Sequence, residues 1–312
     1  MKKRTVISMV SYAAVICAGI VMIPRFFNRA PEQAAGREVT YEGIELSAPL
    51  YTSAPGDNVI RNRYVSVDAS NASQGYVMVR YMGGSEDNPI MKISHGESEY
   101  IYTLRGEEAF PLNCGDGNYA IKIYQRQPGG KYKAVLNKNL SVELDNQLLP
   151  YLYPSQLVGY TEASITVQFS NELCRGIDND LDKLKVVYDY IINNITYDFP
   201  KAANIETGYI PSVDSTYISK TGICFDYSVM LAAMLRTQLI PVKLVMGYLN
   251  GTSVYHAWNE VYLRDKGWVT LNIFVDDRVF SMLDTTLAAS QSDEAISAKL
   301  GNPDIFMPVN RY

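Results

Sequence analysis

The chain has 312 residues, of which 47% are hydrophobic and 20% charged, and its net charge at pH 7 is -5. This composition is ordinary for a globular protein, and the length leaves room for two domains. The negative charge, with no basic run beyond the N-terminus, argues against a nucleic acid as the partner.

The chain begins with a basic segment, residues 2–4, followed by an uncharged apolar run from Thr5 to Ile23. As a helix, this run would be about 28 Å long, close to the thickness of a bilayer core. The positive start keeps the N-terminus inside and sends the rest across the membrane. We therefore expect residues 1–27 to be a membrane anchor, with a cleaved signal peptide as the alternative. In either case the bulk of the protein is expected to be extracytoplasmic, anchored or secreted.

The next segment, residues 28–57, is rich in Pro, Ala and Gly and is typical of a linker. From residue 58 to 146 the pattern changes to short alternating strands separated by Gly and Pro turns, which predicts an all-β sandwich of immunoglobulin-like size. Its expected role is a spacer, with binding to a cell-wall polymer as the alternative. The predicted strands are Tyr64–Asp68, Gly75–Met82, Ile90–Ser94, Tyr100–Leu104, Tyr119–Gln125, Lys131–Val135 and Leu140–Leu144, with His95 in a turn.

Residues 147–312 are predicted to form a second, α+β domain. A helix is expected from Leu181 to Ile195, capped by Asp180 or Asp178, with an apolar stripe that packs in the core. The stripe consists of Leu181, Leu184, Val187, Tyr188, Ile191, Ile192 and Ile195. The tail beyond Leu283 is expected to be partly helical and then irregular around Pro303 and Pro308.

The stretch from Thr221 to Asn272 holds the residues best suited to chemistry. Cys224 follows Thr221-Gly222 and opens a run with helical apolar spacing, which predicts an amphipathic helix that Thr221 caps and Pro241 ends. A cysteine in the first turn meets the positive end of the helix dipole, which favours the nucleophilic thiolate. The apolar positions are Tyr227, Met230, Leu231, Met234 and Leu235.

Three strands are predicted after this helix, at Val242–Leu249, Tyr255–Leu263 and Trp268–Phe274. On the second strand His256 shares a face with Trp258, Glu260 and Tyr262, and on the third strand Trp268, Thr270 and Asn272 share a face. A nucleophile at a helix start, a base on one strand and a polar group on the next is the arrangement of a catalytic triad.

The motifs GxCxDY, HAWNEV and a following GW resemble the transglutaminase-like superfamily of papain-like fold. The resemblance covers roughly the second half of the chain and implies a Cys-His-Asp triad for acyl transfer, with Cys224 as nucleophile and His256 as general base. It places Asn272 where the family has an aspartate. Asparagine can still accept the imidazole N–H and hold its tautomer, but it supports the imidazolium less well.

The partner of His256 on the third strand is left open by the sequence. Asp276 and Asp277 are rival orienting residues. A hairpin loop of residues 265–267 puts Asn272 on the same face as His256, but a strict ladder then pairs Asn272 with Glu260.

The implied reaction is attack of the Cys224 thiolate on a peptide or protein amide, with the substrate a cell-wall-associated peptide or protein. The resulting thioester is resolved by water or by an amine, and hydrolysis is favoured over cross-linking. The alternative is a catalytically inactive binding or scaffolding module of the cell envelope. A weaker alternative is a structural protein of the envelope in which the sandwich is the functional part.

No cofactor or metal is expected, because clustered Cys and His ligands and nucleotide-binding motifs do not occur. Cys114 and Cys174 could pair or stay free.

Overall fold

The structure is a computed structural model that describes residues 39–312 apart from residues 42, 85, 86, 250–254, 272, 277, 278 and 283–305. The predicted anchor at residues 1–27 lies outside the described residues. Among the helices described, none is both long and apolar enough to span a membrane. Residues 37–312 form one compact unit.

Part of the predicted linker folds as a hairpin of β1 (Val39–Tyr41) and β2 (Ile44–Leu46). Val39 and Tyr41 are buried, and the Tyr41 hydroxyl donates a 2.6 Å hydrogen bond to the carbonyl of Leu239. The hairpin is therefore attached to the part of the chain that follows the Cys224 helix.

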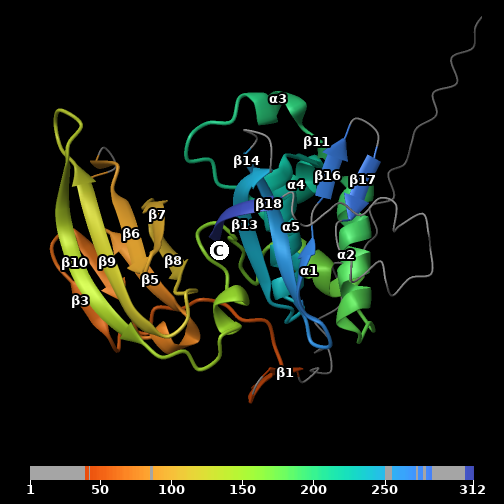
Figure 1. Ribbon diagram of the computed structural model, residues 1–312, viewed down its shortest axis with the longest axis horizontal. Helices are drawn as coiled ribbons and strands as arrows, with labels where there is room; N and C mark the ends of the chain where they lie inside the picture. The colour runs from red at the N-terminus through yellow and green to blue at the C-terminus, as the bar shows by residue number, and fades with distance from the viewer. Residues whose placement is uncertain are drawn as a thin grey trace, which may run out of the picture. The chain divides into compact units, whose positions relative to one another are not determined.

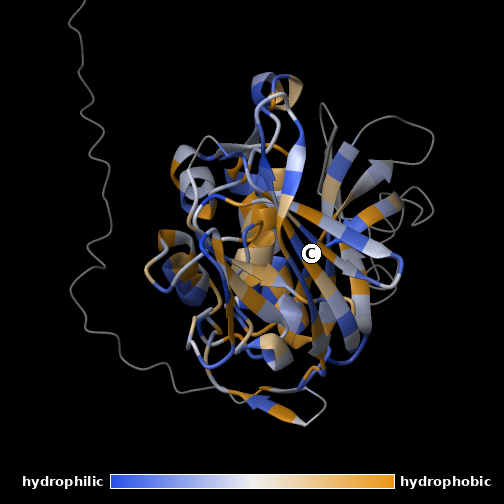
Figure 2. Ribbon diagram, turned by 90° about the vertical axis from the view of Figure 1, so that its left-hand side faces the viewer, coloured by the Kyte–Doolittle hydropathy of each residue, from blue (hydrophilic) through white to orange (hydrophobic). Residues whose placement is uncertain are grey.

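Two antiparallel four-stranded sheets follow, with the orders β3-β4-β5-β8 and β10-β9-β6-β7 (Figure 1). They share one buried core, in which Tyr102 of the second sheet packs edge-on against Phe110 of the first at 4.9 Å. Apolar and polar segments alternate along the strands, as Figure 2 shows, because alternate residues face this core. The strands are β3 (Val59–Arg61), β4 (Val65–Asp68), β5 (Tyr76–Tyr81), β6 (Ile90–His95), β7 (Ser98–Thr103), β8 (Glu107–Pro111), β9 (Gly117–Arg126) and β10 (Tyr132–Val142).

Most of the strands predicted between residues 58 and 146 are found, with three differences. The two last predicted strands are one strand, β10, which continues through a bulge between Ala134 and Leu136. The short strands β3 and β8 had no clear alternation and were not predicted. His95 ends β6 rather than lying in a turn, and its ring stacks on Tyr119 at 4.6 Å. The immunoglobulin-like sandwich stays a prediction.

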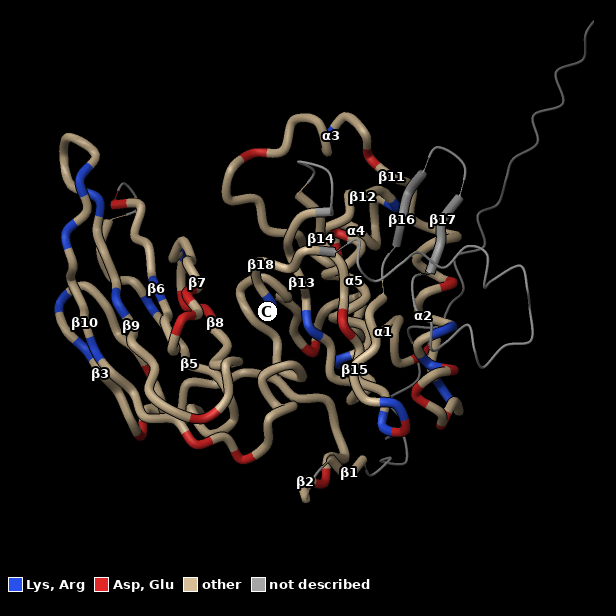
Figure 3. The backbone as a smooth tube through the Cα atoms, viewed as in Figure 1, with Lys and Arg blue, Asp and Glu red and all other residues tan. Residues whose placement is uncertain are grey.

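The helices of the second half are α1 (Ile165–Leu173), α2 (Asp180–Asn194), α3 (Phe199–Ala203), α4 (Val213–Ser219) and α5 (Cys224–Arg236). In α2 the predicted apolar stripe is buried or half-buried, and several Asp and Lys residues lie along the rest of the helix (Figure 3). Its N-cap is Asn179, whose side chain accepts from Leu181 and Asp182, so the predicted cap at Asp180 or Asp178 is wrong. Asp180 instead binds Arg264 through two 2.6 Å hydrogen bonds.

The helix that begins at Cys224, α5, is buried on every side. Each residue from Phe225 to Arg236 is less than 9% exposed, so the helix is not amphipathic as predicted but lies in the centre of the core. It contacts α1, α2 and α4 on one side and β13 (Val242–Leu249) and β14 (Tyr255–Leu263) on the other. Helix α2 thus packs behind α5, as the sequence predicted.

The sheet under α5 is antiparallel and has the order β15-β14-β13-β18. Strands β13 and β14 have the predicted bounds, whereas β15 (Gly267–Leu271) ends earlier than expected. Residues Ile273–Asp276 form β16, which pairs with β17 (Val279–Met282). The edge strand β18 (Phe306–Arg311) was not predicted, because Pro308 argues against a strand; an edge position tolerates proline.

Arg236, the last residue of α5, is buried with 1% of its surface exposed. Its guanidinium donates to three carbonyls: Val242 at 2.7 Å, Tyr153 at 2.7 Å and the C-terminal Tyr312 at 3.3 Å. Burial lowers its pKa to about 10, so it remains charged at neutral pH. One side chain therefore joins the end of α5 to β13, to the segment before α1 and to the chain end.

Replacement of Arg236 by Met should lower the free energy of unfolding by about 2 kcal/mol or more, because the buried carbonyls of Val242 and Tyr153 lose their donor and each orphaned carbonyl costs about 1–3 kcal/mol. Urea unfolding measures the change, with Arg175→Met as the control, because the Arg175 side chain is 73% exposed. A loss below about 1 kcal/mol, equal to that of the control, would contradict this role.

Candidate active site

Cys224 is the first residue of α5 and is half-buried. The helix start is fixed by the backbone N–H of Ile223, which donates a 2.8 Å hydrogen bond to the carboxylate of Asp226. The predicted cap at Thr221 is wrong, because Thr221 and Gly222 form β12, which pairs in parallel with β11 (Thr196–Tyr197). A Cβ at Gly222 would lie 2.7 Å from the Cβ of Asp226, so this position of the GxC motif has room only for glycine.

The Cys224 thiol lies against backbone amides. Burial raises its pKa, and the charge of Asp226 acts in the same direction, while hydrogen bonds from the amides of Ala257, Phe225 and Cys224 itself lower it. The net direction is upward, which is opposite to the thiolate-favouring shift predicted from the helix dipole. The physical reason is that desolvation in this buried position outweighs the amide dipoles.

The contact with Ala257 brings the thiol to β14, one residue from His256. On β14 the N–H groups of alternate residues point to opposite neighbours, and Tyr262 donates to Pro241 on the β13 side. Ala257, of opposite parity, therefore directs its N–H toward the β15 side. Among the described residues, the last pair of β14 with β15 is Asn259 with Leu271, and the Ala257 amide that donates to the Cys224 thiol lies two residues beyond it. The thiol thus lies at the end of β14 that carries His256.

The hairpin register differs from the predicted one. Gly267, with φ +76°, pairs with Leu263, so the turn is residues 264–266 and Glu260 pairs with Thr270. The predicted pairing of Glu260 with residue 272 is therefore wrong by two residues. Asn272 and Asp277 lie outside the described residues, and Asp276 belongs to β16. The orienting role of Asn272 stays a prediction.

On the face of β14 that carries His256, the next two side chains along the strand are those of Trp258 and Glu260. Trp258 is 2% exposed, and Glu260 is bound by Lys243 at 3.3 Å and by Arg311 at 2.8 Å. Gly247, which pairs with His256, allows this packing, because a Cβ there would collide with the backbone of β18 and with the Trp258 ring.

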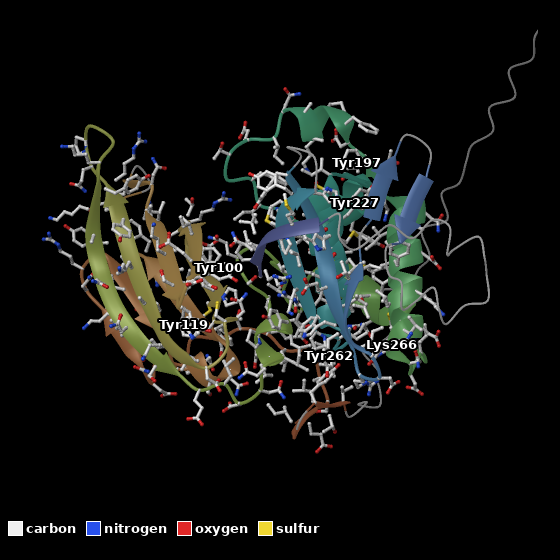
Figure 4. The ribbon with its side chains drawn as sticks, viewed as in Figure 1. Tyr100, Tyr119, Tyr197, Tyr227, Tyr262 and Lys266 are labelled. Carbon is white, nitrogen blue, oxygen red and sulfur yellow. The ribbon has the colours of Figure 1, made fainter. Side chains whose placement is uncertain are left out.

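Tyr197 is a site residue that the sequence analysis missed. The parallel pairing of β11 and β12 sets Tyr197 beside Gly222, and its ring stacks on Tyr227 of α5 at 6.2 Å (Figure 4). Burial raises its pKa, and a hydrogen bond from the backbone amide of Cys224 lowers it. The Tyr197 hydroxyl therefore lies at the amide of the nucleophile. A lone tyrosine after a helix does not by itself indicate a site residue. The short extended segment that contains Tyr197 could, however, have suggested a parallel pairing with the extended residues before Cys224.

Among the residues described, no three His, Cys, Asp or Glu side chains gather in a group that could hold a metal ion. Cys114, Cys174 and Cys224 are all free thiols, so the Cys114–Cys174 pair does not form.

Comparison with known proteins points to one family. Residues 167–273 match the model of the transglutaminase-like superfamily. The uncharacterized protein YebA of Bacillus subtilis is 33% identical over 122 residues, which are 32% of this chain and 16% of YebA. A structure from Cytophaga hutchinsonii, provisionally named a cysteine protease, is 18% identical, covers 76% of this chain and 86% of its own, and has a TM-score of 0.36. Red sea bream transglutaminase is 11% identical over 63% of this chain and 47% of its own, with a TM-score of 0.28.

Replacement of His256 by Ala should slow alkylation of Cys224 by iodoacetamide at pH 7 at least about tenfold, because a thiol without an imidazole partner reacts only as its own raised pKa allows. In the variant, labelling should rise only as the pH passes above about 8.5, the ordinary thiol value. Peptide mapping measures the rate at each cysteine.

The matched control is His95→Ala, which removes the only other histidine of the chain. It should leave Cys224 labelling unchanged. Equal labelling at pH 7 in wild type and in His256→Ala would show that His256 does not activate the thiol.

Proposed function

We propose, from the premise that residues 167–273 are a transglutaminase-like domain, that this protein catalyses cysteine-dependent acyl transfer on peptide or protein amides. The observation that carries the proposal is the position of the Cys224 thiol at the start of a buried helix, against the amide of Ala257, the residue that follows His256 in β14. A nucleophile and a base held by rigid elements at one point are the requirement for covalent catalysis.

The first half of the reaction forms a thioester. His256 takes the proton of the Cys224 thiol, and the sulfur attacks the amide carbonyl carbon, whose oxygen gains the negative charge. When this tetrahedral intermediate collapses, the C–N bond breaks and the imidazolium returns the proton to the leaving amine or ammonia. Because burial raises the thiol pKa, this proton transfer to His256 is the step that makes the sulfur nucleophilic.

The second half releases the acyl group. Water or an amine attacks the thioester, His256 accepts its proton, and the thiol is regenerated when the C–S bond breaks. Water gives hydrolysis, and an amine gives a new amide. We favour hydrolysis, since Cys224 is half-buried rather than fully enclosed and water is the abundant acceptor.

Tyr197 and the Cys224 amide are placed to stabilise the oxyanion. The Tyr197 hydroxyl lies close enough to the Cys224 amide for that N–H to lower the Tyr197 pKa, so we propose that a carbonyl oxygen bound at the sulfur reaches both donors. An oxyanion would accept from the amide N–H and from the phenol O–H together, in the manner of an oxyanion hole. Tyr197 comes from β11 and the amide from α5, so the bound oxyanion would accept hydrogen bonds from two different elements.

A second candidate, a binding module without catalysis, is favoured by one observation, the raised pKa of Cys224. A thiol that stays protonated is a poor nucleophile. For either function we propose an extracytoplasmic location through the N-terminal segment, and a peptide or protein of the cell envelope as the partner.

Replacement of Tyr197 by Phe should lower the rate of p-nitrophenyl acetate hydrolysis roughly 100- to 1,000-fold, the usual effect of removing one oxyanion donor. The control is Tyr188→Phe, because the buried Tyr188 hydroxyl has no hydrogen-bond partner among the described residues and comes from α2, outside the site. Similar rates for the two variants would remove Tyr197 from the oxyanion site, and no hydrolysis above Cys224→Ala in wild type would support the binding module.

Addition of a primary amine, for example putrescine, separates the two acyl acceptors. If hydrolysis dominates, acetate should remain the main product at millimolar amine. A predominance of acetylated putrescine, measured by mass spectrometry, would instead assign the protein to cross-linking.

A further inference from the structure

A buried carboxylate lies two residues from the nucleophile. The Asp226 side chain is 0% exposed, and its oxygens accept from three donors. Oδ2 accepts the Ile223 N–H at 2.8 Å and the Lys201 ammonium at 2.7 Å, and Oδ1 accepts the Tyr209 hydroxyl. A carboxylate without exposure is stable only where such partners replace water.

The cation comes from outside α5. Lys201 belongs to α3, whose first turn is capped by Asp198 through a 2.9 Å bond to the Lys201 N–H. Its ammonium also donates to the Tyr209 hydroxyl at 2.7 Å and lies 4.4 Å from the centre of that ring. Lys201, Tyr209 and Asp226 therefore tie the segment between β11 and α4 to the first turn of α5.

This cluster lies within the electrostatic environment of the thiol. Among the described residues, Tyr197 on β11 and Asp226 on α5 interact electrostatically with Cys224, and His256 on β14 precedes Ala257, whose amide donates to the thiol. Of these, Asp226 opposes formation of a thiolate, since two negative charges at close range repel. Lys201 forms a salt bridge with Asp226. Its side chain is only 30% exposed, so water screens the charges of the pair only in part.

We propose that Lys201 is a positioning residue of the Cys224 site, which holds the first turn of α5 through Asp226 and neutralises that carboxylate so that the neighbouring thiolate can form. Its consequence for catalysis rests on the proposed function, but the electrostatic effect on the thiol does not. The Tyr209 hydroxyl completes the arrangement by donating a hydrogen bond to the second oxygen of Asp226, Oδ1.

The two members of the ion pair have opposite effects on the thiol. Without the Lys201 charge, Asp226 is left uncompensated and the thiolate is disfavoured. Without the Asp226 charge, Lys201 is left as an unpaired cation and the thiolate is favoured. A purely structural role gives no such opposition, because either loss would loosen the same turn and change the exposure of Cys224 in the same way.

The test is the pH profile of iodoacetamide alkylation at Cys224 in the full chain. Lys201→Met should move the profile up by about one pH unit, a typical effect of a single nearby charge. Asp226→Asn should move it down, and the double variant should return close to wild type. Lys201→Arg keeps the charge and should stay within a few tenths of a unit of wild type. Lys185→Met is the matched control, because Lys185 pairs with Asp182 at 3.7 Å on the surface of α2.

Opposite shifts in the two single variants establish the proposal, and shifts in the same direction, or none in Lys201→Met, overturn it. If Asp226→Asn does not fold by circular dichroism, the contrast between Lys201→Met and Lys201→Arg decides the question. Alkylation needs no turnover, so opposite shifts in a protein that hydrolyses no acyl donor would overturn the proposed function and leave this inference standing.

Discussion

The complete burial of α5 is the constraint on which the rest of the structure depends. A helix in the centre of a core must satisfy the polar groups at both of its ends without water. Here side chains serve at both ends: the Asp226 carboxylate accepts the Ile223 N–H at the start, and the hydroxyls of Ser170 and Thr237 donate to the Met234 carbonyl at the finish. Because Asp226 folds back to the helix start, its side chain packs directly on Gly222, where a Cβ would not fit. This packing fixes the first turn of α5 and with it the position of Cys224.

The site also depends on the end of β14 that carries His256. The last described pair of β14 with β15 is Asn259 with Leu271, and the thiol of Cys224 lies by the Ala257 amide two residues beyond it. The parallel bridge of β11 with β12 adds Tyr197 on the other side of the same helix start. Three segments distant in sequence thereby converge on one sulfur atom, and two opposing influences act on it: burial that favours the thiol, and amide dipoles that favour the thiolate.

Sequence reasoning succeeded where the local pattern and the packing agree. Strands β13 and β14 were predicted residue for residue, because both are rich in β-branched and aromatic residues and an Asn-Gly pair follows the first of them in the sequence. The burial of the α2 stripe followed from its period. The failures came from contacts between distant segments: Pro308 concealed β18, and the cap of α5 came from inside the helix instead of from Thr221. Cys224 and His256 were predicted from their motifs, whereas the proposed roles of Tyr197 and Lys201 rest on contacts between segments that are distant in sequence.

The most direct test of the account is to trap an acyl group on Cys224. Wild type, Cys224→Ala and His256→Ala would each be mixed with p-nitrophenyl acetate, quenched in acid and mapped by mass spectrometry. The account predicts one acetyl group on Cys224 of the wild type, lost again as hydrolysis proceeds, and none in either variant. Acetyl groups spread over surface lysines at the same level in all three proteins would contradict it.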